Sequence, residues 1–293
     1  MKKTKAIKFY LLLAVLTSAT ISRAQEREPF VFSYSYFPLE ADNDYIQQIQ
    51  AKILLPVIVN EKYIFGTGVG FLQEDIHSTE INFNDKLYSV GIPLLYQYRF
   101  NKASSLQLIG NISINSQFDD VVFDDAVYIA GASYTKQYSE KLKLGYGIIY
   151  IHQFFGNQIV PIINVNYKPN NKWNISGRFP ANMKGIYSIN EKHSIGLEWM
   201  WLANSFRLDN LVYEEAYVKN KNAMAELFYR LRLWKSSVLQ IGKGYNNKFY
   251  EVYTEESNQL NLFTKPLNQN LTPIQEFENK GLFFNIGVHY IIF

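Results

Sequence analysis

Long stretches of this sequence alternate between apolar residues and residues that are polar or small. From Tyr88 to Phe100 nearly every second residue is aromatic or aliphatic, whereas the positions between them include Ser89, Gln97 and Arg99. A period of two residues is typical of β-strands whose two faces meet different surroundings. Several of these stretches reach 14 residues, whereas strands of soluble proteins usually have about five or six. The pattern therefore predicts an all-β protein with unusually long strands.

Long strands with one apolar and one polar face suit a closed barrel in a membrane. Such a barrel turns its apolar face to lipid and its polar face to a wet interior, and pairs both edges of every strand. After residue 24 no stretch approaches the run of about 18 apolar residues that a transmembrane helix needs. A soluble β-protein would explain the aromatic content but not the long one-sided stripes. We therefore predict a transmembrane antiparallel β-barrel.

Breaks in the alternation divide the chain into 14 expected strands, and counts from 12 to 16 are compatible with them. The least regular stretch covers residues 173–189, where each of two strands would have only about seven residues. Short polar turns alternate with longer, more acidic connections, as in barrels with short periplasmic turns and long outer loops. The even count places both termini on the periplasmic side. The expected strands are 28–37, 44–59, 63–76, 86–100, 105–118, 126–139, 142–155, 159–168, 173–179, 183–189, 193–208, 217–234, 238–250 and 280–293.

The first 24 residues have the layout of a secretory signal peptide. A positive start is followed by a short apolar segment at residues 9–16, and then by the small residues Ser22 and Ala24 before a cleavage position. The apolar segment is too short to span a bilayer. We expect a signal peptide at residues 1–24, a barrel domain at residues 25–293, and export from the cytoplasm.

Composition excludes several classes of function. The chain has no cysteine, which excludes disulfides, thiolate metal sites and cysteine nucleophiles. Five of the 29 basic residues lie in the first 24 residues, so the remainder has 24 basic against 26 acidic residues. No nucleic-acid partner is expected without a basic face. The 22 Tyr, 21 Phe and 4 Trp gather near the expected strand ends, which is typical of girdles at the lipid–water interface.

The charged residues on the polar faces of the expected strands define a candidate lumen. Six of them are basic and two are acidic, and one histidine shares their face. Such a lining would either bias a water-filled pore toward anions, or form a network of ion pairs with the two carboxylates bound to arginines. The sequence leaves both alternatives open. The candidate lumen residues are Lys52, Arg99, Lys143, Arg178, Glu198, Glu226, Arg230, Arg232 and His289.

Two further features lead to local predictions. Lys243 falls on the apolar face of its expected strand, which predicts a bulge or register shift near that position. The connection at residues 251–279 is the longest in the chain, and we expect it to fold into the barrel mouth as a constriction.

Signals for catalysis or metal binding are weak. The four histidines lack a spacing such as His-x-x-x-His, so no metal and no cofactor is expected. Four aspartates at residues 119–125 could bind calcium or magnesium, but a solvated loop is favoured because they lack EF-hand spacing. His289 could work with a serine in a lipid-modifying enzyme, but no serine neighbours it in sequence. We therefore do not expect an enzyme.

The signal peptide, the two-residue period, the alternating connections and the final strand together resemble the Gram-negative outer-membrane β-barrel proteins, and among them uncharacterised barrels with porin-like architecture. The resemblance implies the cell outer membrane, contact with its lipid and lipopolysaccharide, and recognition of the last strand by the barrel-assembly machinery. Phe293 is similar to the terminal signal for that machinery, but it lies on the opposite face from Phe284, Ile286 and Val288. We expect a monomeric passive channel or facilitator for small solutes. The alternative is a non-conducting structural or surface-interaction barrel.

Overall fold

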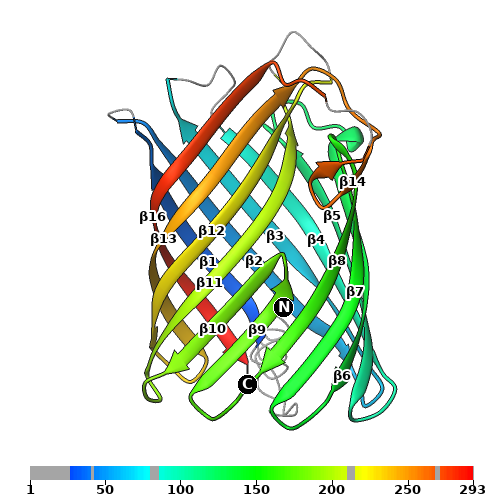
Figure 1. The fold of residues 1–293 in the computed structure, drawn as a ribbon, viewed down its shortest axis with the longest axis vertical. Coiled ribbons are helices and arrows are strands. Elements are labelled where there is room, and N and C mark those ends of the chain that lie inside the picture. Colours follow the sequence, from blue (N-terminus) through cyan, green and yellow to red (C-terminus); the bar gives the residue numbers. More distant parts are fainter. Residues whose placement is uncertain (1–26, 41–42, 80–85, 210–214, 268–270, 293) are drawn as a thin grey trace, which may run out of the picture.

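The computed structural model describes residues 27–40, 43–79, 86–209, 215–267 and 271–292. Within them the chain forms one closed antiparallel barrel of 14 strands, with two short additional strands (Figure 1). No helix among these residues has the length and apolar character needed to cross a membrane. The expected signal peptide and Phe293 lie outside the described residues.

Consecutive strands pair with one another around the barrel, and β1 pairs with β16 to close it. The connection between β13 and β16 carries β14 (Leu260–Leu262) and β15 (Lys265–Pro266), and a short 3-10 helix, η1 (Phe123–Asp125), precedes β6. The barrel strands are β1 (Arg27–Pro38), β2 (Tyr45–Val59), β3 (Tyr63–His77), β4 (Lys86–Arg99), β5 (Ser104–Ser116), β6 (Ala126–Gln137), β7 (Leu142–Gln153), β8 (Gly156–Tyr167), β9 (Trp173–Phe179), β10 (Asn182–Ser188), β11 (His193–Arg207), β12 (Tyr217–Arg232), β13 (Ser237–Tyr253) and β16 (Gln275–Ile292).

The predicted fold class and strand number are confirmed. The clearest difference concerns the connection expected at residues 251–279, because β13 continues to Tyr253 and β16 already begins at Gln275. Phe277 and Asn279 are buried on the inner face of this extension, whereas Glu276 and Glu278 are exposed on the outer face. Because these outer residues are charged, this part of the strand lacks the apolar stripe from which the other strands were predicted.

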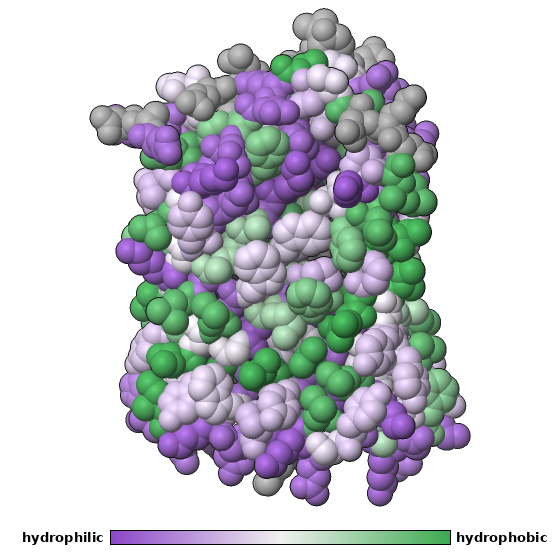
Figure 2. Space-filling view, in the orientation of Figure 1, coloured by the Kyte–Doolittle hydropathy of each residue, from purple (hydrophilic) through white to green (hydrophobic). Residues whose placement is uncertain are grey.

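The outer surface carries the apolar belt that a lipid-facing wall requires. Phe32, Leu197, Leu227, Ile241 and Ile286 are all exposed, although each lies in the middle of a regular strand. Figure 2 shows hydrophobic residues over the middle and lower parts of one face, and hydrophilic residues gathered at both rims.

Lys243 lies within this belt, but the predicted bulge is wrong. The ladder of β13 runs without a register shift against both β12 and β16. Lys243 is exposed and pairs with Leu227 and Phe284, and its ammonium lies 5.4 Å from the centre of the Phe284 ring. A regular strand thus presents one cation among apolar side chains.

The wall is incomplete above the β9–β10 hairpin, which reaches only about half the height of its neighbours (Figure 1). On this side β8 pairs with β9 only from Ile163 to Tyr167, and β11 pairs with β10 only up to Met200. Instead, β14 runs parallel to β8 along the upper edge of that strand. The Trp201 N–H still donates to the Ala181 carbonyl at the tip of the hairpin, at 2.8 Å. Beyond it, the upper segment of β11, residues 201–207, has a strand partner among the described residues on one side only.

Side chains from the inside of the barrel take the place of that missing partner. Gln153 Nε2 donates to the carbonyl of Ala203 at 2.8 Å, and Asn115 Nδ2 donates to the carbonyl of Ser205 at 3.2 Å. The Phe154 N–H donates to Ser205 Oγ at 3.1 Å. Asn115 belongs to β5, which is not a neighbour of β11 in the sheet. Its hydrogen bond to Ser205 crosses the interior, so the upper segment of β11 leans into the lumen.

We predict that Lys243→Leu stabilises the barrel. A lysine at the lipid-facing midplane of a barrel costs about 2–4 kcal/mol relative to an apolar residue, and Lys243 has exposed apolar neighbours on both paired strands. The free energy of unfolding, measured by denaturant titration in lipid vesicles, should rise by about 2 kcal/mol. Lys102→Leu, in the exposed turn after β4, is the matched control. An unchanged or lower value for Lys243→Leu would show that this position does not face hydrocarbon.

Candidate functional site

The upper half of the lumen is filled by a packed core. Thirteen buried residues form one cluster to which β1, β2, β3, β4, β11, β12, β13 and β16 all contribute. The rings of Phe37 and Phe283 stack with centroids 5.2 Å apart. A second buried cluster covers the inner face of β7 and β8, and Phe263 of the long connection packs against it. Apolar side chains therefore meet across the upper lumen, where an open pore would have a wet, polar wall.

A buried ionic centre lies within this upper core. Glu74 of β3 accepts hydrogen bonds from Tyr250 Oη at 2.6 Å and from Asn220 Nδ2 at 2.9 Å, and it forms an ion pair with Lys248. Lys248 is fully buried, and its ammonium lies 4.1 Å from the centre of the Phe37 ring. These contacts join β3 to β12 and β13 across the lumen. Removing one partner of such a pair would leave a buried charge without compensation.

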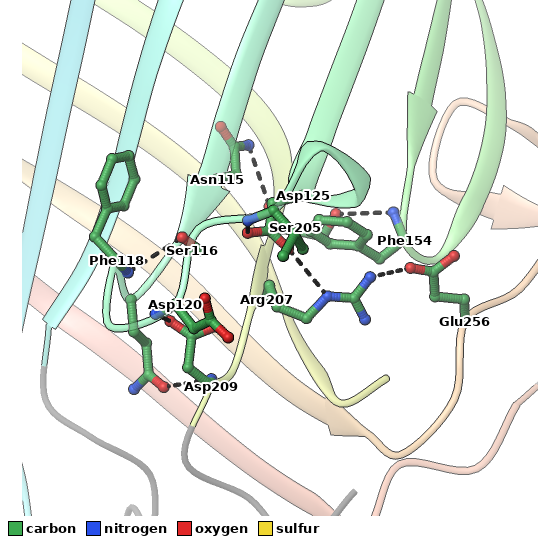
Figure 3. A network of polar contacts seen from close by, with 12 residues as sticks. Asn115, Ser116, Phe118, Asp120, Asp125, Phe154, Ser205, Arg207, Asp209 and Glu256 are labelled. Atoms are coloured by element: carbon green, nitrogen blue, oxygen red, sulfur yellow. Dashed lines mark hydrogen bonds and ion pairs between the residues drawn. The ribbon is translucent and has the colours of Figure 1, made fainter. Parts of the chain in front are cut away.

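A second polar group fixes the outer end of β11 (Figure 3). Arg207 forms ion pairs with Asp125 of η1, at 3.4 Å, and with Glu256 of the connection between β13 and β16. Its guanidinium also stacks on the Phe154 ring, 4.5 Å from the centroid. Burial raises the pKa of the Asp125 carboxyl, while the hydrogen bond from the Val122 N–H and the charge of Arg207 act in the opposite direction. Arg207 thus links three outer segments, and we call this group the Arg207 latch.

In the loop at residues 119–125, the Asp125 carboxylate and the backbone N–H of Asp119 have partners within the protein. Asp125 accepts the Val122 N–H at 3.2 Å, and Asp209 accepts the backbone N–H of Asp119 at 3.0 Å (Figure 3). Among the described residues no group of three or more His, Asp or Glu side chains has the arrangement of a metal site.

The lower half of the lumen is polar, and a single carboxylate bridges it. Glu28 of β1 lies within 2.7 Å of Arg230 Nη2, 3.1 Å of His289 Nδ1 and 3.6 Å of Lys184 Nζ. Lys184 belongs to β10, which is separated from β1 by β16, β13, β12 and β11 in the sheet order. The Glu28 bridge therefore joins two sides of the lumen.

Four of the candidate lumen residues belong to this network or adjoin it. Arg230 and His289 contact Glu28 directly, and Glu198 pairs with Lys184 at 3.2 Å. Glu226 accepts a hydrogen bond from Gln240 Nε2 at 3.1 Å. The ion-pair alternative placed these two carboxylates on arginines, whereas Glu198 pairs with Lys184, Glu226 bonds Gln240, and Arg230 pairs with Glu28. Gly242 makes room for Glu226, since an added Cβ would lie 1.9 Å from its Oε1 atom.

The other five candidates lie at two cavities or at the lower rim. Lys52, Lys143 and Arg178 line a cavity of about 450 Å³, to which Glu28 and Lys184 also contribute. A larger cavity of about 690 Å³ opens among the turns at the lower rim, and its lining includes Arg230 and Arg232. Arg99 is at the end of β4, where its guanidinium donates to the Glu61 carbonyl at 3.4 Å.

Comparison with known protein families gives one match, to the domain of unknown function DUF6268, over residues 71–291. The chain belongs to this family. A comparison with curated proteins finds no match.

Among solved structures, this DUF6268 barrel is similar to outer-membrane porins and barrels, in agreement with the resemblance seen in the sequence. The NanC porin is 7% identical, with a TM-score of 0.37 over 89% of this chain and 98% of its own. The KdgM porin is 9% identical, with a TM-score of 0.35 over 90% and 99%. OmpT, an outer-membrane protein of Vibrio cholerae, is 9% identical, with a TM-score of 0.30 over 94% and 100%. At these values the likeness concerns the barrel architecture alone.

Sequence reasoning missed three residues of the lower lumen in this DUF6268 barrel. Glu28 lies beside a register shift between Arg27 and Phe30, so strict alternation does not apply there. Lys184 lies on the same face of β10 as the buried Ile186. An apolar residue therefore lies on the inner face, which is usually polar. Gln240 is neutral, so a prediction of lumen residues from charged side chains did not include it. The one available signal in the sequence was Glu28 itself, because an acidic residue at the start of β1 needs a cationic partner.

We predict that Lys248→Met destabilises the barrel strongly. The substitution leaves the Glu74 carboxylate buried without its cation, and such a loss costs about 3–5 kcal/mol. The double variant Glu74→Gln/Lys248→Met should lose less, because no charge stays unpaired and the glutamine can still accept from Tyr250. Unfolding in vesicles measures both variants, with Lys102→Met as the control. Equal losses in the single and double variants would contradict a charge-paired centre.

Proposed function

We propose that this protein is a channel-type barrel of the outer membrane that facilitates passage of small anionic solutes, and that the structure is its closed state. The observation that carries this proposal is the contrast within the lumen. The lower half holds polar cavities with a basic lining, whereas the upper half is closed by side chains. Solute from the periplasmic side would reach the lower half and stop at the core.

The charge of the lower lumen supports preference for anions. Ten cations and three carboxylates line the two cavities, and Glu198 and Glu226 lie nearby. Charged linings with an excess of one sign raise the local concentration of the opposite ion and select for it. The cations are Lys52, Lys143, Arg178 and Lys184 in the smaller cavity and Lys141, Lys168, Lys172, Lys192, Arg230 and Arg232 in the larger, and the lining carboxylates are Glu28, Glu140 and Glu191.

The way β11 is held supports opening at its upper segment. Residues 201–207 have a full ladder with β12 on one edge, but on the other edge they are held mainly by side-chain donors and by the Arg207 latch. Moving this segment toward the gap above the β9–β10 hairpin breaks few backbone hydrogen bonds. It would also draw Phe206 out of the upper core.

Localisation and partners follow from the same proposal. The apolar belt supports contact with outer-membrane lipid and lipopolysaccharide, and export would use the signal peptide expected at residues 1–24. Assembly through the C-terminal strand, a monomeric state, and the lack of a catalytic role or cofactor are parts of this proposal.

The second candidate is a barrel that does not conduct and acts through its outer surface. The observation that favours it is the upper core itself, because eight strands contribute to one buried apolar cluster. A core of this kind would contribute to stability in the way that the interior of a soluble protein does.

We predict that Arg207→Ala raises the open probability of single channels in planar bilayers. The change removes both ion pairs of the latch, so the upper segment of β11 loses its tie to η1 and to the long connection. Wild-type protein should open rarely, and the variant should open at least about tenfold more often, as expected when about 1.4 kcal/mol of closed-state stability is lost.

Lys265→Ala is the matched control, because Lys265 is an exposed cation of the same connection. It should behave as wild type. If neither wild type nor Arg207→Ala shows openings while both are folded, the facilitator proposal is wrong and the non-conducting barrel is favoured.

A further inference from the structure

The cavity of about 450 Å³ lies against the inner face of the β9–β10 hairpin. Its walls come from both sides of the lumen, with Lys52 from β2, Asn164 from β8 and Arg178 from β9. The volume is within the usual range of small-molecule sites, about 300–1,000 Å³. Strands fix these residues, which gives the cavity the rigid frame of a binding site.

Two cations of this cavity lack a counter-charge of their own. Within the described part of the chain, the Lys52 ammonium has no hydrogen bond or ion pair. The Arg178 guanidinium donates from Nε to Asn164 Oδ1 at 3.2 Å, and none of the described carboxylates lies within ion-pair distance of it. Lys52 and Arg178 also lie close enough to repel one another.

Glu28 lines the same cavity and attracts Lys52, but it forms no ion pair with Lys52 or Arg178. Its carboxylate is held by Arg230, His289 and Lys184. Two neighbouring cations without an ion-paired carboxylate of their own raise the energy of the empty cavity. An oxyanion placed between them would remove that penalty and gain charge-assisted hydrogen bonds.

An unpaired donor in the same cavity points independently to a ligand. The Nδ2 atom of Asn166 is buried and has no hydrogen-bond partner among the residues that the structure describes, and Asn166 lines the cavity. Buried donors in proteins are almost always bonded. A ligand oxygen in the cavity would supply the missing acceptor.

The remaining wall indicates a hydrophilic ligand. Among the described lining residues only Val165 and Ile186 contribute apolar side chains, and none contributes an aromatic ring. An acyl chain or a ring would therefore meet polar groups with no compensation. Amides and hydroxyls able to bond several ligand hydroxyl groups come from Gln97, Ser105, Gln107, Thr135, Ser176 and Asn182.

From these observations we infer that the cavity binds a small polyhydroxylated oxyanion, whose carboxylate or phosphate lies between Lys52 and Arg178 and whose hydroxyls bond the amide and hydroxyl wall. The inference rests on the proposed function in one respect, since it names the class of solute that would use the channel. Binding itself needs no open pore.

Isothermal titration calorimetry on the purified protein in detergent tests the site. Gluconate tests a carboxylate and glucose 6-phosphate tests a phosphate, each together with several hydroxyl groups. Glucose lacks the anionic group, and octanoate lacks the hydroxyl groups. Wild type should bind at least one of the two hydroxylated anions, and glucose and octanoate at least about tenfold more weakly. The stronger of the two anions identifies the oxyanion that the site prefers.

Lys52→Gln and Arg178→Gln should each weaken binding of that anion at least about tenfold. Lys102→Gln removes the same charge from an exposed turn and should leave binding unchanged. Arg178→Lys keeps the charge without the forked donors, so its affinity should lie between those of wild type and Arg178→Gln. Heat-dependent migration on gels shows whether each variant is folded.

Five results test the site and separate it from the channel. Absence of binding by folded wild type, or glucose binding as tightly as the anions, overturns the site. Wild-type affinity in folded Lys52→Gln and Arg178→Gln overturns it as well. Charge-dependent binding in a protein whose Arg207→Ala variant never conducts supports the site while the channel proposal fails. Conductance without anion binding leaves the channel proposal in place and overturns the site.

Discussion

Every backbone donor and acceptor within a bilayer must find a partner inside the protein, and this requirement organises the whole structure. Thirteen successive ladders and the pairing of β1 with β16 meet it around most of the wall. The exception is the upper edge of β11, where the short β9–β10 hairpin provides no partner beyond the hydrogen bond from the Trp201 N–H to the Ala181 carbonyl. Side chains of Gln153 and Asn115 complete the hydrogen bonds there. Because those donors come from inside, the edge is drawn into the lumen.

The inward position of β11 divides the lumen into two regions of different chemistry. Above, strands approach closely enough for Phe206, Tyr250 and Phe283 to share one apolar cluster, and the buried charges are paired. Below, charged side chains such as Lys52 and Arg178 line a cavity of about 450 Å³. One chain thus combines an interior typical of a soluble protein with the wet interior of a channel.

The two-residue period was sufficient to predict the fold class, the number of strands and most of their positions, because each lipid-facing stripe is local in sequence. It could not predict which inner residues meet. Phe37 and Phe283 are stacked, yet about 250 residues separate them along the chain. Glu28 was missed because a register shift interrupts the alternation beside it. Lys243 suggested a bulge because sequence patterns do not reveal that its ammonium lies over the Phe284 ring of the neighbouring strand.

The Glu28 bridge has a consequence for assembly. Its carboxylate is on the first strand of the sheet, whereas His289 is on the last and Arg230 and Lys184 are on strands that lie beyond it. The bridge can therefore form only when the two end strands meet. Until then, three cationic or protonatable groups in the nascent sheet lack their shared anion. Pairing of β1 with β16 and formation of these ion pairs therefore occur together, so electrostatic attraction stabilises the closed barrel but not the open sheet.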